Sequence, residues 1–254
     1  MKRNVWQSIF FYLGLLLLWE ILYLFGVDIL KLWKSYTIPS PDHFFQRAIF
    51  LFSSSTIYKA VLASLWRILQ GFIISVILGT LLGLCMVAVP FFGRNIKPLI
   101  LGLQTLPSIC WVSFAILWYG LSQNAVIFVI VIGSMFSVAM SVRSCIENVN
   151  PLYIRAARTM GVEGRKLYTW VIFPASFPGF LTGLRQAWSF AWRALMSAEM
   201  MISMAGLGQA LDSARNIRND INEVMVIMVL IIILGTVIDT GIFQQIEKRL
   251  YKEK

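Results

Sequence analysis

The chain is poor in charged residues and in the groups that soluble enzymes use for catalysis. Only 13% of its 254 residues are charged, against about 25% in soluble domains. A single histidine, His43, cannot form a cluster, so a zinc site or a Ser/His/Asp centre is disfavoured. The sequence has no Gly-Lys dipeptide and hence no phosphate loop of the Walker type, so the chain cannot hydrolyse ATP by that chemistry.

Cysteine is also scarce. Cys85, Cys110 and Cys145 are isolated residues inside or at the ends of apolar runs, with no CxxC pair and no metal ligand nearby. We expect them to be free thiols packed among apolar side chains. They do not indicate a metal site.

Long apolar runs dominate the chain instead. Hydrophobic residues make up 58% of it, and the mean hydropathy is +0.75. A membrane-spanning helix needs ~20 mostly apolar residues. Six runs are long enough, near residues 9–26, 60–89, 100–120, 124–146, 176–199 and 224–243. The sequence therefore predicts an all-α polytopic membrane protein with about six transmembrane helices, and we treat residues 1–254 as one domain with core spans at about 60–243.

Basic residues are distributed unevenly between the connections. With the N-terminus in the cytoplasm, cytoplasmic segments hold 13 of the 22 Lys and Arg residues, and external segments hold six. Because short cytoplasmic segments retain Lys and Arg, both termini are expected in the cytoplasm. Most of the net charge of +10 then lies on the cytoplasmic side and is explained by the orientation of the chain in the membrane. A nucleic-acid partner is therefore not indicated.

Small residues, a proline and an arginine occur within the runs. Gly79 and Gly83 are four residues apart, as are two glycines of the fifth run, Gly179 and Gly183. This spacing allows a neighbouring helix to approach closely, although it also arises by chance. Pro107 removes an amide donor from the third run and predicts a kink or break there. The second run exceeds one membrane thickness, so we expect its first two turns outside, with Arg67 at the membrane interface.

The segment at about residues 150–174, between the fourth and fifth runs, differs from the other connections. Its first part predicts a short amphipathic helix that Gly161 ends in a left-handed conformation. Three residues share one face of this helix: Leu152, Ala156 and Met160. A compact second part is expected to follow until Pro174 and Pro178 stop it. The alternative for the first part is a helix that rests on the bilayer through its arginines.

This segment resembles the cytoplasmic coupling loop of ABC importer permeases. The family signature is Glu-Ala-Ala, three residues, Gly, nine residues, then Ile-x-Leu-Pro. The resemblance implies that seven residues couple the chain to an ATPase: Arg155, Ala156, Ala157, Arg158, Gly161, Val171 and Pro174. Arg155 stands where the family has Glu, which reverses a charge at or near the ATPase contact.

Nearly the whole chain resembles permeases of the nitrate, sulfonate and taurine importer family. Similar runs lie at 38–41, 105–121, 155–161, 182–188, 198–200 and 206–208. The resemblance implies the type I ABC importer permease fold in the cell (inner) membrane and a homodimer. It also implies two ATPase subunits, which would bind ATP and Mg²⁺, an external solute-binding protein, and no cofactor in this chain. The implied solute is an organic sulfonate, taurine or nitrate-like oxyanion, with bicarbonate or an uncharged or aromatic precursor as alternatives.

Polar residues inside the fifth run are candidates for the solute pathway, because a charge at the bilayer centre costs on the order of 3 kcal/mol. Four of them recur every four residues, with Trp192 alongside: Arg185, Ser189, Arg193 and Ser197. We expect this stripe to line the route and to favour a small anion. The alternative is that the two arginines pair with Glu20 or Glu199 on other helices. Further pathway candidates, for which packing is the alternative role, are Gln104, Ser108 and Trp111, and Glu199 completes the set.

Two other classes of protein could have a similar composition. A membrane-embedded enzyme would need convergent nucleophile, acid/base or metal groups, and the lone His43 argues against it. A secondary transporter often shows an inverted repeat, and we detect none in the sequence.

Overall fold

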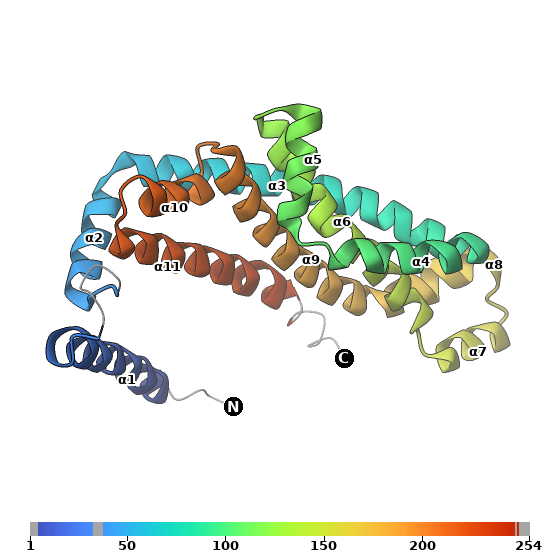
Figure 1. Cartoon of the computed structure of the whole chain (residues 1–254). Helices are drawn as coiled ribbons and strands as arrows, with labels where there is room; N and C mark the ends of the chain where they lie inside the picture. The colour runs from blue at the N-terminus through green and yellow to red at the C-terminus, as the bar shows by residue number, and fades with distance from the viewer. Residues whose placement is uncertain (1–4, 33–37, 247, 249–254) are drawn as a thin grey trace.

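The computed structural model describes residues 5–32, 38–246 and 248, and these ranges form helices joined by turns and short connections (Figure 1). In chain order the elements are α1 (Val5–Tyr23), η1 (Leu24–Ile29), α2 (Pro41–Ser53), α3 (Ser55–Ala88), α4 (Pro90–Thr105), α5 (Ser108–Tyr119), α6 (Gln123–Glu147), α7 (Pro151–Thr159), α8 (Gly164–Leu167), η2 (Tyr168–Ile172), α9 (Phe173–Ile202), α10 (Leu207–Asn216), α11 (Ile221–Ile238) and η3 (Asp239–Phe243). The elements labelled η are π-helical turns.

Three long helices, α3, α6 and α9, cross at the centre of the molecule, and α5 packs on α6 and α9 (Figure 1). Their facing side chains form the main core, which includes Ile68, Val112, Val126, Ile130, Ala191 and Leu195. Elsewhere their surfaces are strongly apolar and exposed, as expected of helices that meet lipid or other subunits. The predicted all-α architecture is confirmed.

Glycine allows α6 to approach both of its long neighbours. A Cβ added at Gly79 of α3 would lie 2.6 Å from the carbonyl oxygen of Met135 on α6, and one added at Gly83 would be similarly close to the α6 backbone. On α9, a Cβ at Gly183 would collide with Ser141 of α6. The close approach predicted from the glycine spacing is therefore confirmed. In lipid, where the hydrophobic effect does not drive helices together, such close van der Waals packing stabilises their association.

Five helical segments are long and apolar enough to span a membrane, and the α4–α5 pair makes up to six. The pair bends by 95° between Thr105 and Ser108. Leu106, which precedes the proline, is extended, as residues before proline tend to be, and Pro107 is the N-cap of α5. The break predicted at Pro107 is thus confirmed, and the predicted third run is divided between the end of α4 and α5.

Pro174 and Pro178 do not stop the second part of the segment at 150–174, contrary to our expectation. Helix continues from Gly164 to Ile202 through α8, η2 and α9. Pro174 lies in the first turn of α9, directly after the π-helical turn η2, and Pro178 lies inside α9. A widened turn and the surrounding helices can satisfy the backbone groups that a proline frees, which is why proline is tolerated in membrane helices.

Two short helices, α2 and α10, were not expected from the sequence. The predicted turn at 38–41 leads into α2, and its Ser40 is the N-cap of that helix. The Ser40 hydroxyl accepts a hydrogen bond from the His43 amide at 3.2 Å. Arg47 of α2 pairs with two acids at the start of α11: Asp220, its N-cap (2.9 Å), and Glu223 in its first turn (2.6 Å). In Figure 1, α2 and α10 lie at one end of the molecule, and α7 and α8 lie at the other.

The cysteines are free, but two of them are not packed within the chain. Cys85 and Cys110 are exposed, and Cys145 is partly buried. The expectation of packed thiols was wrong for the first two because they lie on outward faces of α3 and α5. In an apolar run an outward face can be as hydrophobic as an inward one, so the sequence does not distinguish them.

Candidate functional site

The segment predicted to couple the chain to an ATPase, residues 150–174, begins with helix α7, and we call it the coupling segment. The Asn150 side chain accepts a hydrogen bond from the Leu152 amide at 2.9 Å, and Pro151 occupies the first helical position, where its missing donor costs nothing. After α7, Gly161 adopts a left-handed conformation with φ of 78°. The helix and its glycine end are therefore as predicted.

One side of α7 packs on the rest of the coupling segment. Ala157 is 2% exposed and contacts a small apolar cluster with Leu167 and Ile172, against which Val171 is partly buried. The opposite side is free. Leu152 and Met160 are 61% and 76% exposed, and the neighbouring residues Ala156, Arg155 and Arg158 are exposed as well.

Two roles can therefore be separated among the seven predicted coupling residues. Ala157 and Val171 hold the segment together, and Gly161 provides its turn. The other three helix residues, Arg155, Ala156 and Arg158, are exposed on α7, which lies at one end of the molecule (Figure 1). Pro174 belongs to α9 and is exposed.

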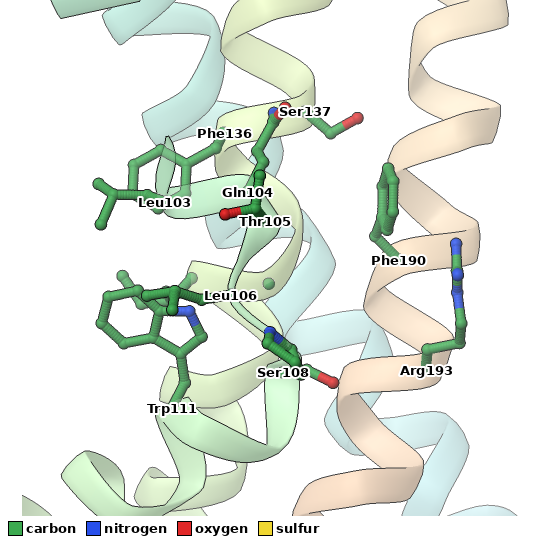
Figure 2. A pocket seen from close by; sticks show the side chains of 13 residues that line it. Leu103, Gln104, Thr105, Leu106, Ser108, Trp111, Phe136, Ser137, Phe190 and Arg193 are labelled. Atoms are coloured by element: carbon green, nitrogen blue, oxygen red, sulfur yellow. The ribbon is translucent and has the colours of Figure 1, made fainter. Parts of the chain in front are cut away.

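A hollow of about 280 Å³ opens where α4 and α5 break apart, facing α6 and α9. We call it the α4–α5 hollow. It brings together four of the predicted pathway residues: Gln104, Ser108, Trp111 and Arg193. Figure 2 shows Gln104 and Ser108 on one side and Phe190 and Arg193 of α9 on the other. A fifth candidate, Ser197, lies 3.3 Å from Ser108, oxygen to oxygen.

Arg193 is exposed at the edge of this hollow. Its guanidinium carbon lies 4.7 Å from the ring centre of Phe190, and its Nε donates to the Ser189 carbonyl oxygen at 3.3 Å. Within the described part of the chain, no carboxylate lies within ion-pair distance of it. Most of its hydrogen-bonding capacity is therefore available to a ligand.

A second hollow of about 570 Å³ lies between α9 and α11, and we call it the α9–α11 hollow. Its lining includes four predicted pathway residues: Arg185, Ser189, Trp192 and Arg193. Arg185 donates to Asp239 through Nε (2.6 Å) and Nη2 (2.5 Å). Arg185 is thus paired across helices, as one alternative held, with Asp239 in place of the expected Glu20 or Glu199. Asp239 is an acid inside the sixth apolar run, which was the sequence signal that we missed.

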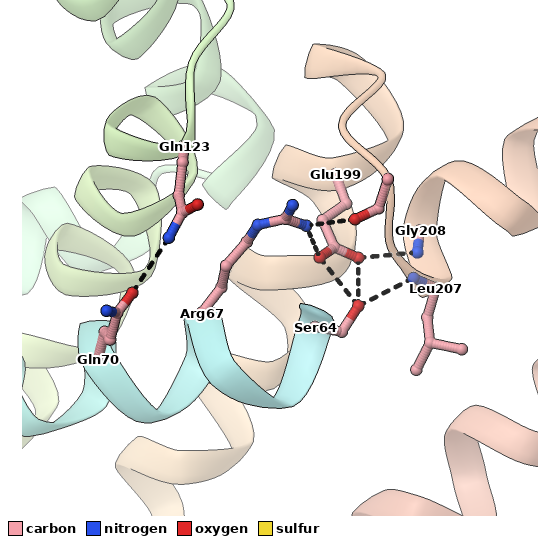
Figure 3. A network of polar contacts seen from close by, with 8 residues as sticks. Ser64, Arg67, Gln70, Gln123, Glu199, Leu207 and Gly208 are labelled. Carbon is pink, nitrogen blue, oxygen red and sulfur yellow. Dashed lines mark hydrogen bonds and ion pairs between the residues drawn. The ribbon is translucent and has the colours of Figure 1, made fainter. Parts of the chain in front are cut away.

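Glu199 lines neither hollow. Its side chain is fully buried and pairs with Arg67 of α3 at 2.7 Å (Figure 3). Arg67 is thus neutralised inside the protein, as a buried charge requires, and its depth relative to the membrane interface stays a prediction. The two residues are 132 positions apart, and nothing in the sequence pairs them.

Comparison with known proteins identifies the family. Residues 75–252 match the model of binding-protein-dependent transport system inner membrane components. The chain belongs to this family. A protein of Methanocaldococcus jannaschii named as an ABC transporter permease is 31% identical over 76% of this chain and 72% of its own length. The taurine transport system permease protein of Escherichia coli is 27% identical over 84% of this chain and 78% of its own length.

The fold of this permease agrees with that assignment. A chain of a methionine ABC transporter, solved in an inward-facing conformation, superimposes with a TM-score of 0.66 at 17% identity, covering 77% of this chain and 96% of that one. The protein is therefore an ABC importer permease with the type I fold, an integral multi-pass membrane subunit. The alternatives of a membrane-embedded enzyme and of a secondary transporter do not hold for a member of this family.

Proposed function

We propose that two copies of this permease form a pathway that imports a small oxyanion, such as an organic sulfonate, taurine or a nitrate-like ion. An external binding protein would deliver the solute, and two cytoplasmic ATPase subunits, which hold ATP and Mg²⁺, would drive its passage. The observation that carries the choice of an anion is Arg193, a cation at a hollow with no carboxylate partner among the described residues.

The α4–α5 hollow has the chemistry for an anion with a small organic part. Gln104, Ser108 and Ser137 place an amide and two hydroxyls around it, and Arg193 adds a positive charge. Trp111 and further aromatic side chains supply apolar walls. Ligand sites commonly combine apolar walls with a few convergent polar groups, and arginine suits planar or tetrahedral oxyanions because its donors form a fork.

The coupling segment can transmit force to this hollow. Its exposed surface around Ala156 is the part available to an ATPase, and the segment packs against the start of the continuous helix that runs from Gly164 to Ile202. Arg193 lies on that helix. A displacement of α7 would therefore move a helix that lines both hollows, as a rigid element should.

The directions of the first and last helices support the proposal that both termini lie in the cytoplasm, on the same side of the membrane as α7. Trp19, near the end of α1, donates to the Pro39 carbonyl oxygen at 3.1 Å and contacts Phe44 of α2, so α1 ends near α2. Asp220, which precedes α11, is also held by α2 through Arg47. Since α2 lies opposite α7 (Figure 1), both terminal helices point their outer ends away from α2, toward the side of α7.

Competition for uptake tests the proposal. The permease would be reconstituted in vesicles with its cognate ATPase and binding protein, and ATP-dependent uptake of radiolabelled taurine measured against excess alkanesulfonate, nitrate, bicarbonate or a neutral pyrimidine. Competition by the sulfonate or nitrate supports an oxyanion route. Competition by the neutral pyrimidine alone would overturn the oxyanion route, and competition by bicarbonate alone would overturn the choice of a sulfonate or nitrate-like ion. Uptake without the ATPase would overturn the ATP-driven role.

A further inference from the structure

A buried polar cluster joins the end of α9 to α3 (Figure 3). Its side chains, Ser64, Arg67 and Glu199, are 0%, 6% and 0% exposed. The Ser64 hydroxyl lies 2.9 and 2.7 Å from the two Glu199 carboxylate oxygens, and Arg67 Nη1 donates to one of them at 2.7 Å. The same Nη1 donates to the Ala205 carbonyl oxygen at 2.8 Å, in the turn that follows α9.

The cluster also holds the beginning of α10. The Leu207 amide donates to the Ser64 hydroxyl oxygen at 2.8 Å, and the Gly208 amide donates to Glu199 Oε2 at 3.0 Å. The first amides of a helix have no partner within the helix, and here side chains of two other helices satisfy them. A buried carboxylate also interacts favourably with the positive end of the α10 dipole.

Glycine makes this contact possible. A Cβ at Gly206 would collide with the Glu199 carboxylate, and a Cβ at Gly208 would lie 2.7 Å from the Glu199 Cβ. The turn therefore rests directly on Glu199 with no room for a side chain between them. The end of α9, the turn and the start of α10 are fixed to α3 by one set of bonds.

The position of the cluster on α9 gives it a mechanical context. The helix that contains α9 begins in the coupling segment at Gly164 and ends at Ile202, three residues after Glu199. The cluster is therefore at the end of α9 that is remote from α7, next to α10, which with α2 forms the opposite end of the molecule (Figure 1). If the coupling segment moves and α9 moves with it as a rigid helix, the cluster is displaced as well.

We infer that Glu199 is a positioning residue for transport: with Ser64 and Arg67 it makes α10 and α3 follow the end of α9, so that an event at α7 changes the opposite end of the permease. The inference rests on the proposed coupling through α7. Stability alone does not explain the cluster well, because buried ion pairs are often no more stabilising than apolar packing of the same volume. A set of directional bonds between three helices does, however, fix their relative positions.

The test uses Ser64→Ala and Glu199→Gln in the reconstituted complex with the ATPase and the binding protein. The matched control is Ser134→Ala, which removes an equally buried serine bond, to Ser75, between α6 and α3. We expect both test variants to keep ATP hydrolysis without binding protein but to lose its stimulation by solute-loaded binding protein about fivefold or more, the usual lower range of coupling between sites. Solute imported per ATP should fall in parallel, and the control should behave like the parent.

Hydrogen exchange gives a second readout that needs no partner. In the detergent-solubilised permease, Ser64→Ala should speed amide exchange at residues 207–208 about five- to tenfold, with exchange in α7 unchanged. Stimulation and exchange equal to the parent in folded Ser64→Ala would overturn the inference, as would equal losses in Ser134→Ala. A parent complex without ATP-driven uptake would instead overturn the proposed function.

Discussion

Arg185 on α9 and Asp239 at the start of η3 form a two-point ion pair, with Nε 2.6 Å from Oδ1 and Nη2 2.5 Å from Oδ2. The pair ties the helix that carries the coupling segment to the last span, at the wall of the α9–α11 hollow. It also separates the two arginines of α9 by role. Arg185 has its carboxylate, and Arg193, two turns along the same helix, is exposed at both hollows.

The Arg185–Asp239 pair is expected to contribute modestly to stability, because polar contacts between membrane helices contribute about 0.6 kcal/mol on average. We predict that Arg185→Gln and Asp239→Asn each lower the free energy of unfolding by about 1 kcal/mol or less. The double variant should lose little more than either single one, since both remove the same interaction. Unfolding by titration with SDS in mixed micelles would measure this, and fully additive losses would contradict it.

The glycines of α3 offer a sharper stability prediction. We expect Gly79→Ala to lower the free energy of unfolding by about 1–3 kcal/mol, because the new methyl group would lie 2.6 Å from the Met135 carbonyl oxygen and force α3 away from α6. Gly102→Ala in α4 is the control, since nothing lies within 4 Å of the added group. It should be neutral or stabilising by up to about 1 kcal/mol through helix propensity. The same SDS titration measures both variants. Equal changes in the free energy of unfolding would show that the close contact between α3 and α6 does not require glycine at position 79.

The lengths of the apolar runs were sufficient to predict the membrane spans, and the proline in the third run was sufficient to predict the break at Pro107. They worked because the bilayer imposes one length and one composition on every span, and because proline lacks a donor wherever it stands. The coupling helix was predictable for a local reason too, since Asn150, Pro151 and Gly161 are end signals within one short segment.

The contacts that depend on distant parts of the chain could not be predicted in this way. Arg67 and Glu199 are each a charge in an apolar run, and only the crossing of α3 and α9 makes them partners. The short helix α10 has a mixed composition and is held by side chains of other helices, so its own sequence says little. The α4–α5 hollow likewise arises from the 95° bend and from four helices together.

Arg155 supplies a prediction about assembly. The residue is exposed on α7, where the family signature has a glutamate. If the ATPase presents a complementary acidic group there, Arg155→Glu should weaken binding of the cognate ATPase about tenfold, and Arg155→Ala should weaken it less, because only reversal adds repulsion. Binding of the purified ATPase to the permease in nanodiscs measures both, with Lys97→Glu on α4 as a control for net charge. Unchanged affinity in Arg155→Glu would contradict a contact at this position.

Arg193 supplies the most direct prediction about the pathway. Removing its charge with Arg193→Ala should reduce ATP-dependent uptake of the anion about 10- to 100-fold, since hydrogen bonds to a charged group contribute about 1.5–3 kcal/mol. Arg193→Lys should retain part of the uptake, because it keeps the charge and loses the two-point fork. Arg185→Gln should reduce uptake much less, as Arg185 is engaged by Asp239. Initial uptake rates at saturating binding protein provide the comparison, and parental uptake by folded Arg193→Ala would eliminate this arginine from the anion route.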